Sequence, residues 1–478
     1  MVLERDGMNI TPRSVKKERA FFIIYMFLFA ALAITVAIMQ PIFDNSPLFS
    51  NPPDEHSRIL IPEFIAKYGY LPTGLEEEII IDGYGISYGL TPYLPYLIMG
   101  YLMRFAGLFT ESELFFVYIG RFVNIVCGLC MAYTVYKLSN KVFLDDFYRW
   151  MFNICVVFLP QHIFIYTYIN TEAMCFLGIS LVLYFLVSIY KDGIDIKNAF
   201  GLSIGLTFVI STYYNAYGYV VSAFVLFLAY FVSGKENKKI SYDYKKMLKY
   251  FVFIFAIVFA LSGWWFIRNA ILHDGDFLGM TTQNKMYLSV NPSGRPSYLN
   301  KGYSLFEMFD MNPDYFDKLW KTLIAGYGSA AMFCNNMFYL FYKIIWLVGL
   351  TISFIYGVFK IFIAKKYKKK MSFSNVFFHI NMIYCICMPI VLHLYYAYAV
   401  DYQPQGRYLL PMLLPLYFYI VKGYEVLFRT LRGRFEELSK VKHFVPVIIS
   451  AFVIFSAVWM IYKVAAPVYL SDPLWTQF

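Results

Sequence analysis

The sequence predicts an all-α membrane protein that crosses the bilayer about eleven times. The chain has 478 residues, of which 59% are hydrophobic and only 15% are charged, and its mean hydropathy is +0.54. A soluble protein of this length would carry roughly 25% charged residues. Apolar runs of about 20 residues, the length that an α-helix needs to cross a membrane, recur from one end of the chain to the other.

Eleven of these runs are expected to be transmembrane helices of a single domain, 1–478. We expect the first run to be a retained span and not a signal peptide, because no small-residue cleavage site follows it. The expected spans are 21–40, 114–136, 150–169, 172–190, 197–213, 216–232, 250–270, 337–361, 375–398, 408–428 and 444–464.

One further apolar stretch, residues 88–109, is expected to lie along the membrane surface. Two prolines and Arg104 interrupt it. If it crossed, the basic clusters 235–249, 360–370 and 429–442 would face away from the basic N-terminus. If it does not cross, all of them share one side, as the positive-inside rule requires. We therefore expect a cytoplasmic N-terminus, and the net charge of +10 indicates topology and not nucleic-acid binding.

This topology leaves two large outer loops, 41–113 and 271–336. The first is expected to carry interfacial helices. The distinctive polar residues gather at the outer ends of the spans, and the centre of the membrane is almost free of charge. Because transporters tend to bury ionisable groups near the midplane, this pattern favours an enzyme that acts on a lipid-borne substrate at the membrane boundary.

The most informative stretch follows the first expected span. Pro52 and Pro53 fix the backbone and remove two donors, so that Asp54 and Glu55 are held away from the hydrocarbon edge. Asp54 also precedes a helical pattern, and capping that helix is the structural alternative to a chemical role. Arg121 lies about two turns into the second expected span and is expected to have a buried partner that the sequence does not identify.

Four segments together resemble the glycosyltransferase-C (GT-C) superfamily, which includes the protein O-mannosyltransferases and the aminoarabinose transferases. The resemblance is closest to a bacterial branch of multi-spanning proteins. The segments follow the superfamily's order over most of the chain. They are Pro52-Pro53-Asp54-Glu55, Tyr168-Ile169-Asn170-Thr171-Glu172-Ala173, Ser262-Gly263-Trp264-Trp265-Phe266-Ile267-Arg268-Asn269 followed by Asp274-Gly275-Asp276, and Gln405-Gly406-Arg407-Tyr408-Leu409-Leu410-Pro411.

The resemblance implies a sugar donor linked to polyprenyl phosphate, an active site outside the cytoplasm, and inversion at the anomeric carbon. The acceptor would be a cell-envelope glycan, lipid or protein, and the location a bacterial plasma membrane. The acidic residue of the first outer loop, which is Asp54 here, would be the general base, with Glu55 as support or alternate. Partial burial would bring the pKa of Asp54 closer to the working pH.

The same resemblance places the donor phosphate against arginines, since a guanidinium can hold a phosphate by two hydrogen bonds. The candidates are Arg268, Arg407 and Arg58, although Arg268 and Arg58 could instead anchor to lipid headgroups. Glu172 could either bind substrate or complement a helix dipole. The candidate substrate-binding residues are His56, Asn170, Glu172, Trp265, Asn269, Gln405 and Tyr408.

No cofactor is expected with certainty. Glu55 could hold a divalent metal ion if the protein belongs to a metal-dependent branch. Asp274-Gly275-Asp276 imitates a metal motif of nucleotide-sugar transferases, but it reads as a turn.

One feature departs from the superfamily's pattern. Many relatives carry a lysine near the outer end of the fifth span, where this chain has Ser211-Thr212-Tyr213-Tyr214-Asn215. If that lysine binds donor phosphate elsewhere, an arginine must do so here. Two alternative functions stay open, an oligosaccharide polymerase or ligase that uses diphosphate-linked chains, and a lipid-glycan transporter.

Overall fold

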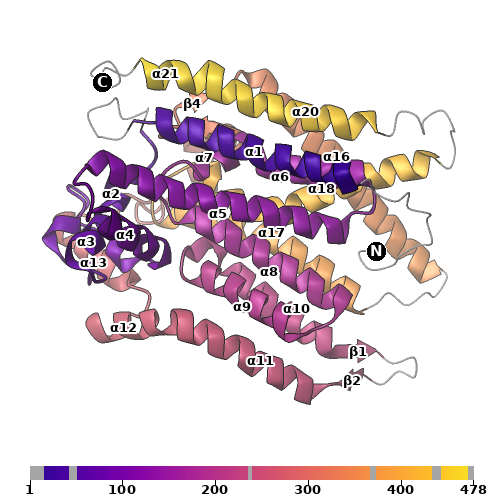
Figure 1. Ribbon diagram of the computed structural model, residues 1–478, viewed down its shortest axis with the longest axis horizontal. Helices are drawn as coiled ribbons and strands as arrows, with labels where there is room; N and C mark the ends of the chain where they lie inside the picture. The colour runs from indigo at the N-terminus through magenta and orange to yellow at the C-terminus, as the bar shows by residue number, and fades with distance from the viewer. Residues whose placement is uncertain (1–14, 42–50, 235–239, 367–372, 433–442, 472–478) are drawn as a thin grey trace.

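The computed structural model describes residues 15–41, 51–234, 240–366, 373–432 and 443–471, and it confirms an all-α membrane fold. Its long helices lie side by side in one bundle (Figure 1). Within the described residues, nine spans are long and apolar enough to cross a membrane. They are built from α1 (Val15–Met39), α5 (Glu113–Val142), α8 (Glu172–Asp192), η3 (Tyr214–Ala216) with α10 (Gly218–Phe231), α11 (Tyr244–Val258) continued by the π-helical η4 (Phe259–Gly263) and α12 (Trp264–Leu272), α16 (Asn336–Lys366), α17 (Phe373–Ala399), η5 (Gly406–Met412) with α18 (Leu413–Arg432), and α20 (Phe444–Trp459) continued by the π-helical η6 (Met460–Ala465) and α21 (Ala466–Leu470).

Two of the eleven expected spans form shorter helices, so the count of eleven is not confirmed. The expected span 150–169 is divided into α6 (Asp146–Val157) and α7 (Pro160–Ile165). Pro160 has no backbone N–H to continue α6, and it is instead a favourable residue for the first turn of α7. The expected span 197–213 is α9 (Ile196–Ile210), whose 15 residues rise only about 22 Å.

The apolar stretch that was expected not to cross forms η2 (Tyr88–Leu90) and α4 (Leu94–Ala106). With 13 residues, α4 is too short to cross a hydrocarbon core of about 30 Å. It lies at one end of the bundle in a lobe with other short helices (Figure 1). These are α2 (Glu55–Arg58), α3 (Leu60–Tyr68), η1 (Glu77–Ile79) and α13 (Met280–Val290).

The second large loop also contributes short elements. After α13 come α14 (Leu305–Met311), α15 (Tyr315–Ile324) and a hairpin of β3 (Gly326–Tyr327) and β4 (Met332–Phe333), in which Gly326 lies opposite Phe333. Ser329 in this hairpin donates a hydrogen bond to the carbonyl of Asn51 at 3.2 Å. The second large loop therefore contacts the chain just before Asp54.

The opposite end of the bundle carries the start of α1 and the hairpin of β1 (Val232–Gly234) and β2 (Ile240–Tyr242) (Figure 1). The start of α11 and the ends of α16 and α18 lie at this same end. Parts of the basic clusters, namely 235–239, 367–372 and 433–442, fall outside the described residues. The helix ends that flank them share one end of the bundle, and the assignment of that end to the cytoplasm stays a prediction.

Close packing of α8 against α9 fixes the position of the candidate site. A Cβ atom added to Gly205 of α9 would lie 2.9 Å from the backbone nitrogen of Val182 in α8, so the two backbones touch. Small residues permit this approach in membrane helices. Glu172 is the first residue of α8 and therefore stands at one end of this closely packed pair of helices.

Candidate functional site

Asp54 begins the site with a strained backbone. It occupies the N-cap position of α2 with φ 60° and ψ 7°, in the left-handed region, and its side chain makes no capping hydrogen bond. Its backbone carbonyl instead accepts from the N–H groups of Ser57 and Arg58. The capping alternative is therefore wrong, and the Asp54 carboxylate is directed to other partners.

Those partners are two arginines. Nη2 of Arg407, in η5, lies 3.2 Å from Oδ2 of Asp54, and Nη2 of Arg58 lies 3.9 Å from the same oxygen. Arg407 also donates to the hydroxyls of Tyr408 at 3.0 Å and Tyr168 at 3.5 Å. The Asp54 side chain is 40% exposed, whereas that of Arg407 is 6% exposed. One partly open carboxylate thus faces a buried cation.

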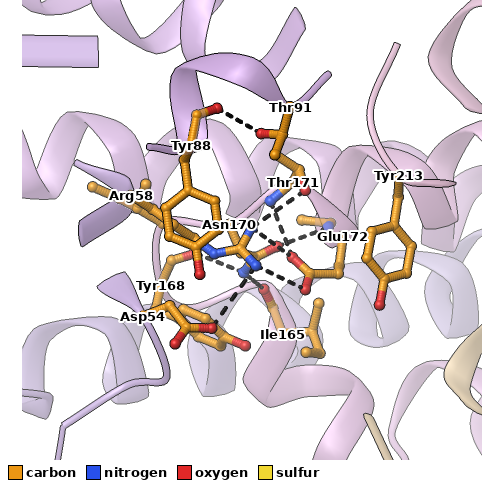
Figure 2. Close-up of polar contacts among 12 residues, drawn as sticks. Asp54, Arg58, Tyr88, Thr91, Ile165, Tyr168, Asn170, Thr171, Glu172 and Tyr213 are labelled. Atoms are coloured by element: carbon orange, nitrogen blue, oxygen red, sulfur yellow. Dashed lines mark hydrogen bonds and ion pairs between the residues drawn. The ribbon is translucent and has the colours of Figure 1, made fainter. Parts of the chain in front are cut away.

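Arg58 joins this pair to the tip that precedes α8. Its Nη1 and Nη2 atoms each lie 3.4 Å from one carboxylate oxygen of Glu172, and Nη1 lies 3.4 Å from the Thr171 hydroxyl. The ring of Tyr88 lies against the guanidinium, 4.7 Å from ring centre to Cζ. Figure 2 shows the Arg58 guanidinium between the carboxylates of Asp54 and Glu172.

Neighbouring charges control the pKa values here. Burial raises the pKa of the Asp54 carboxyl, but the guanidiniums of Arg407 and Arg58 lower it more, so the net pKa lies below the usual value. Burial lowers the pKa of Arg58, but Glu172 and nearby tyrosines raise it well above its usual value. The sequence suggested a pKa for Asp54 closer to the working pH. The structure differs because two cations outweigh burial.

Glu55 lies next to Asp54 in the chain but has a separate partner. Its oxygens lie 3.0 Å from Nε and 2.5 Å from Nη2 of Arg121, and its Oε1 also accepts from the backbone N–H of Ile169 at 2.8 Å. Both side chains of this ion pair are buried. Arg121 also donates to backbone carbonyls of residues 37–41. Glu55 is therefore the partner of Arg121 that the sequence did not identify.

The carboxylates do not fit a divalent metal ion. Each acidic side chain of the site is paired with at least one arginine, and Glu55 already accepts three hydrogen bonds. Among the described residues there is no group of three or more His, Cys, Asp or Glu side chains that could hold a metal. The carboxylates of the site therefore have arginines as partners and not a metal ion.

Asn170 has a local structural task at the same tip. Its amide nitrogen donates to the carbonyls of Ile165 at 2.7 Å and Tyr168 at 2.9 Å, and its oxygen accepts from the N–H of Ala173 at 2.9 Å. These bonds shape the turn that presents Glu172. His56 follows Glu55 in α2 and is exposed, and Gln405 is the N-cap residue of η5, two positions before Arg407.

Arg268 is bound elsewhere. Its Nη2 donates to the carbonyls of Leu71 at 2.9 Å and Pro72 at 2.8 Å, so this arginine fastens α12 to the first outer loop. Trp265 is buried and stacks on Tyr93. Asn269 is also buried, and neither atom of its amide has a hydrogen-bond partner. Of the three arginines expected at the phosphate, the structure brings together Arg58 and Arg407.

Two other expectations concern nearby turns. Residues 273–275 form a turn, and Oδ2 of Asp276 accepts from the N–H of Thr282, so Asp274-Gly275-Asp276 is a turn as expected. At the place of the relatives' lysine, the Ser211 hydroxyl pairs with that of Ser262, and Thr212 donates to a helix carbonyl. Tyr213 of this segment lies beside Glu172, which is the partner of Arg58 (Figure 2).

The sequence did not identify three tyrosines that line the site. Tyr88 lies on Arg58, the Tyr96 hydroxyl lies 3.5 Å from its Nη1, and Tyr213 lies beside Glu172 (Figure 2). The chain has 44 tyrosines. Because no local motif marks these three, only the fold identifies them.

The comparisons with known proteins find archaeal oligosaccharyltransferases. The Archaeoglobus fulgidus enzyme tethered to an acceptor peptide is 12% identical, with a TM-score of 0.48 over 94% of this chain and 55% of that chain. AglB from the same organism, in complex with an inhibitory peptide and a dolichol-phosphate, is 13% identical, with a TM-score of 0.48 over 95% and 56%. No family model and no curated protein matches. The chain thus spans little more than half the length of these oligosaccharyltransferases.

Proposed function

We propose that this chain transfers a sugar from a polyprenyl-phosphate donor to the hydroxyl of an extracytoplasmic acceptor. The observation that carries the proposal is the partly exposed Asp54 carboxylate beside the buried guanidiniums of Arg407 and Arg58. A displacement of this kind needs a base for the hydroxyl proton and fixed cations for the departing phosphate. In this site the carboxylate that would be the base lies 3.2 Å from Arg407 and 3.9 Å from Arg58, the cations that would hold the phosphate.

The roles follow from the chemistry of these groups. Asp54 accepts the proton of the acceptor hydroxyl as that oxygen attacks the sugar carbon from the side opposite the phosphate, so that the configuration inverts. Arg407 and Arg58 stabilise the phosphate as the bond to the sugar breaks. Its charge rises in the transition state, and cations fixed beforehand therefore stabilise the transition state more than the bound donor.

The surrounding residues keep this arrangement in place. Glu172 holds Arg58 by both carboxylate oxygens, and the hydroxyl of Tyr408 contacts Arg407. We assign His56 and Gln405 to substrate contacts, because they adjoin the base and the phosphate-binding arginine in the chain. Trp265 stacks on Tyr93 and so supports the first loop from α12, and the buried amide of Asn269 has donors and an acceptor to offer a substrate.

The proposal also covers the setting of the reaction. The site lies at the end of the bundle that carries the α2–α4 lobe, opposite the start of α1 (Figure 1). We assign this end to the extracytoplasmic face of a bacterial plasma membrane. The acceptor would be a cell-envelope glycan, lipid or protein.

The test is release of polyprenyl phosphate by the purified chain from a panel of polyprenyl-phosphate sugars, with crude membrane glycolipids as acceptor. Asp54→Asn should reduce release by about 100-fold or more, the usual contribution of a general base. Asp82→Asn, which alters an exposed carboxylate of the same loop, should leave release unchanged. The reactions are run with and without a chelator, and we expect no effect of the chelator.

Several outcomes would contradict the proposal. Equal release by Asp54→Asn and the wild type would refute the assigned base. Release from diphosphate-linked oligosaccharides alone would indicate the polymerase or ligase alternative. Movement of an intact lipid-linked glycan across proteoliposomes, with no release from any donor, would indicate a transporter.

A further inference from the structure

The two carboxylates that contact Arg58 are held with different strengths. Glu172 is 3% exposed, meets Arg58 through both oxygens, and accepts the backbone N–H of Thr171 at 3.1 Å. Asp54 is 40% exposed and contacts Arg407 through a single oxygen at 3.2 Å. A phosphate that entered the site would therefore displace Asp54 more readily than Glu172.

Arg407 has donors to offer such a phosphate. A guanidinium carries five N–H donors, and the contacts of Arg407 in this site are one carboxylate oxygen and the hydroxyls of Tyr408 and Tyr168. Its Nε–H is buried without a partner. Since an unpaired buried donor costs free energy, an anion that reaches Nε and the Nη groups together is favoured.

The charges of the cluster sharpen the competition. Asp54, Glu172, Arg58 and Arg407 contribute two negative and two positive charges, which cancel. A bound phosphate would add negative charge to a buried cluster whose two positive charges are already balanced by two carboxylates. Because like charges at close range repel, Asp54 and a phosphate cannot both pair with Arg407 at full strength.

We propose that Asp54 and the phosphate are exchangeable ligands of Arg407, so that the charged Asp54 side chain limits phosphate binding and helps expel the phosphate product. The inference rests on the proposed function for the identity of that product and for the role of Asp54 as the base. It makes Arg407 the group through which the base and the leaving group are coupled.

During sugar transfer, the negative charge that Asp54 loses equals the negative charge that the phosphate gains. The O–H bond of the acceptor breaks, and its proton goes to Asp54 as the new bond from oxygen to sugar carbon forms. The bond between the sugar carbon and the phosphate oxygen breaks, and its electron pair stays on the phosphate. Asp54 loses one negative charge while the phosphate gains one, so Arg407 can follow the charge from one partner to the other. Once Asp54 returns its proton to water, it again competes for Arg407.

The test measures binding and needs no sugar donor. The purified full chain is titrated with farnesyl phosphate, and separately with inorganic phosphate, by isothermal calorimetry at fixed ionic strength. Asp54→Asn should bind farnesyl phosphate about tenfold more tightly than the wild type, within the usual range of coupling between sites. The same direction is expected for inorganic phosphate, because the exchange concerns the phosphate group alone. Asn adopts the left-handed conformation of residue 54 nearly as readily as Asp, so the variant should keep its backbone.

Two further variants separate exchange from a general charge effect. Arg407→Gln should weaken binding about tenfold, and Asp54→Asn should give no further tightening in that background. Asp82→Asn should bind as the wild type does. Equal or weaker binding by Asp54→Asn, the same tightening with and without Arg407, or no phosphate binding by any variant would each overturn the inference. Transfer without tightening would refute the exchange alone, and tightening without transfer would refute the proposed function alone.

Discussion

Glu55→Gln should lower the stability of the protein and leave the chemistry of the folded fraction largely intact. Glu55 forms a buried ion pair with Arg121, and their side chains are 7% and 1% exposed. The substitution removes the negative charge and leaves the guanidinium in the same buried place. The base assigned here, Asp54, keeps its own arginine partners.

The magnitude follows from the contacts that remain. Loss of one member of a buried ion pair costs about 3–5 kcal/mol because the other charge is left uncompensated. Arg121 would keep its hydrogen bonds to carbonyls of residues 37–41, and the amide oxygen of glutamine could still accept from Ile169. We therefore expect a loss near the lower limit, about 3 kcal/mol.

The assay is denaturant or thermal unfolding of the detergent-solubilised chain, together with donor turnover per folded molecule. Glu78→Gln is the matched control, since Glu78 pairs with Lys67 at 2.9 Å in the same loop but both side chains are exposed. Exposed pairs contribute little, so this variant should unfold as the wild type does. If Glu55→Gln were as stable as Glu78→Gln and had lost turnover, Glu55 would be the base and the structural role would be refuted.

Three other predictions follow from the same geometry. The pKa of Asp54 is lowered, and a general base acts in its charged form. In a pH profile of kcat/KM, activity should therefore persist below the usual aspartate pKa and fall only as the pH drops through the lowered value. In Arg407→Gln, the acid limb of this profile should move to higher pH. Burial, with a smaller contribution from Glu113, raises the pKa of Glu63 to about 7. The folded protein therefore favours protonated Glu63, and the stability that this form contributes is present below the usual glutamate pKa and lost as the pH rises through about 7. In unfolding experiments, Glu63→Gln should be more stable than the wild type at pH 8 by at most about 3 kcal/mol and no different from it at pH 4. Arg268→Gln should lower the unfolding temperature, because the carbonyls of Leu71 and Pro72 lose their hydrogen-bond donor. It should leave farnesyl phosphate binding unchanged. Binding about tenfold weaker than in the wild type would show that Arg268 contacts the phosphate.

Hydropathy identified the spans best where nothing local interrupted the helix. The stretch 88–109 was excluded by its prolines, by Arg104 and by the positive-inside rule, and Pro92 and Pro95 precede or begin a helix of only 13 residues. Hydropathy failed at 150–169, although Pro160 was present in the sequence to mark the break. The sequence average over this segment is apolar throughout, and an average does not register one missing N–H group. Breakers must therefore be weighed within a predicted span as well as beside it.

The site could be predicted in its members but not in its pairings. Asp54, Arg58, Glu172 and Arg407 were all candidates, yet Asp54 and Arg407 are separated by 353 positions in the chain. Nothing in the local pattern of either segment identifies the other. The same limit explains Arg268, whose sequence context resembles that of a phosphate ligand while its guanidinium is bound by backbone carbonyls of a loop about 200 residues away.

The adjacent acids Asp54 and Glu55 show why neighbours in a chain can have different tasks. The left-handed backbone at Asp54 turns the chain, so its carboxylate meets Arg407 while the next one meets Arg121. Because each carboxylate has its own cation, the pair need not share a proton, as two carboxylates at one site would. A left-handed non-glycine residue costs roughly 1 kcal/mol or more. The buried anchor of Glu55, one residue further on, can hold the backbone in that conformation, so that one acid of the pair positions the other.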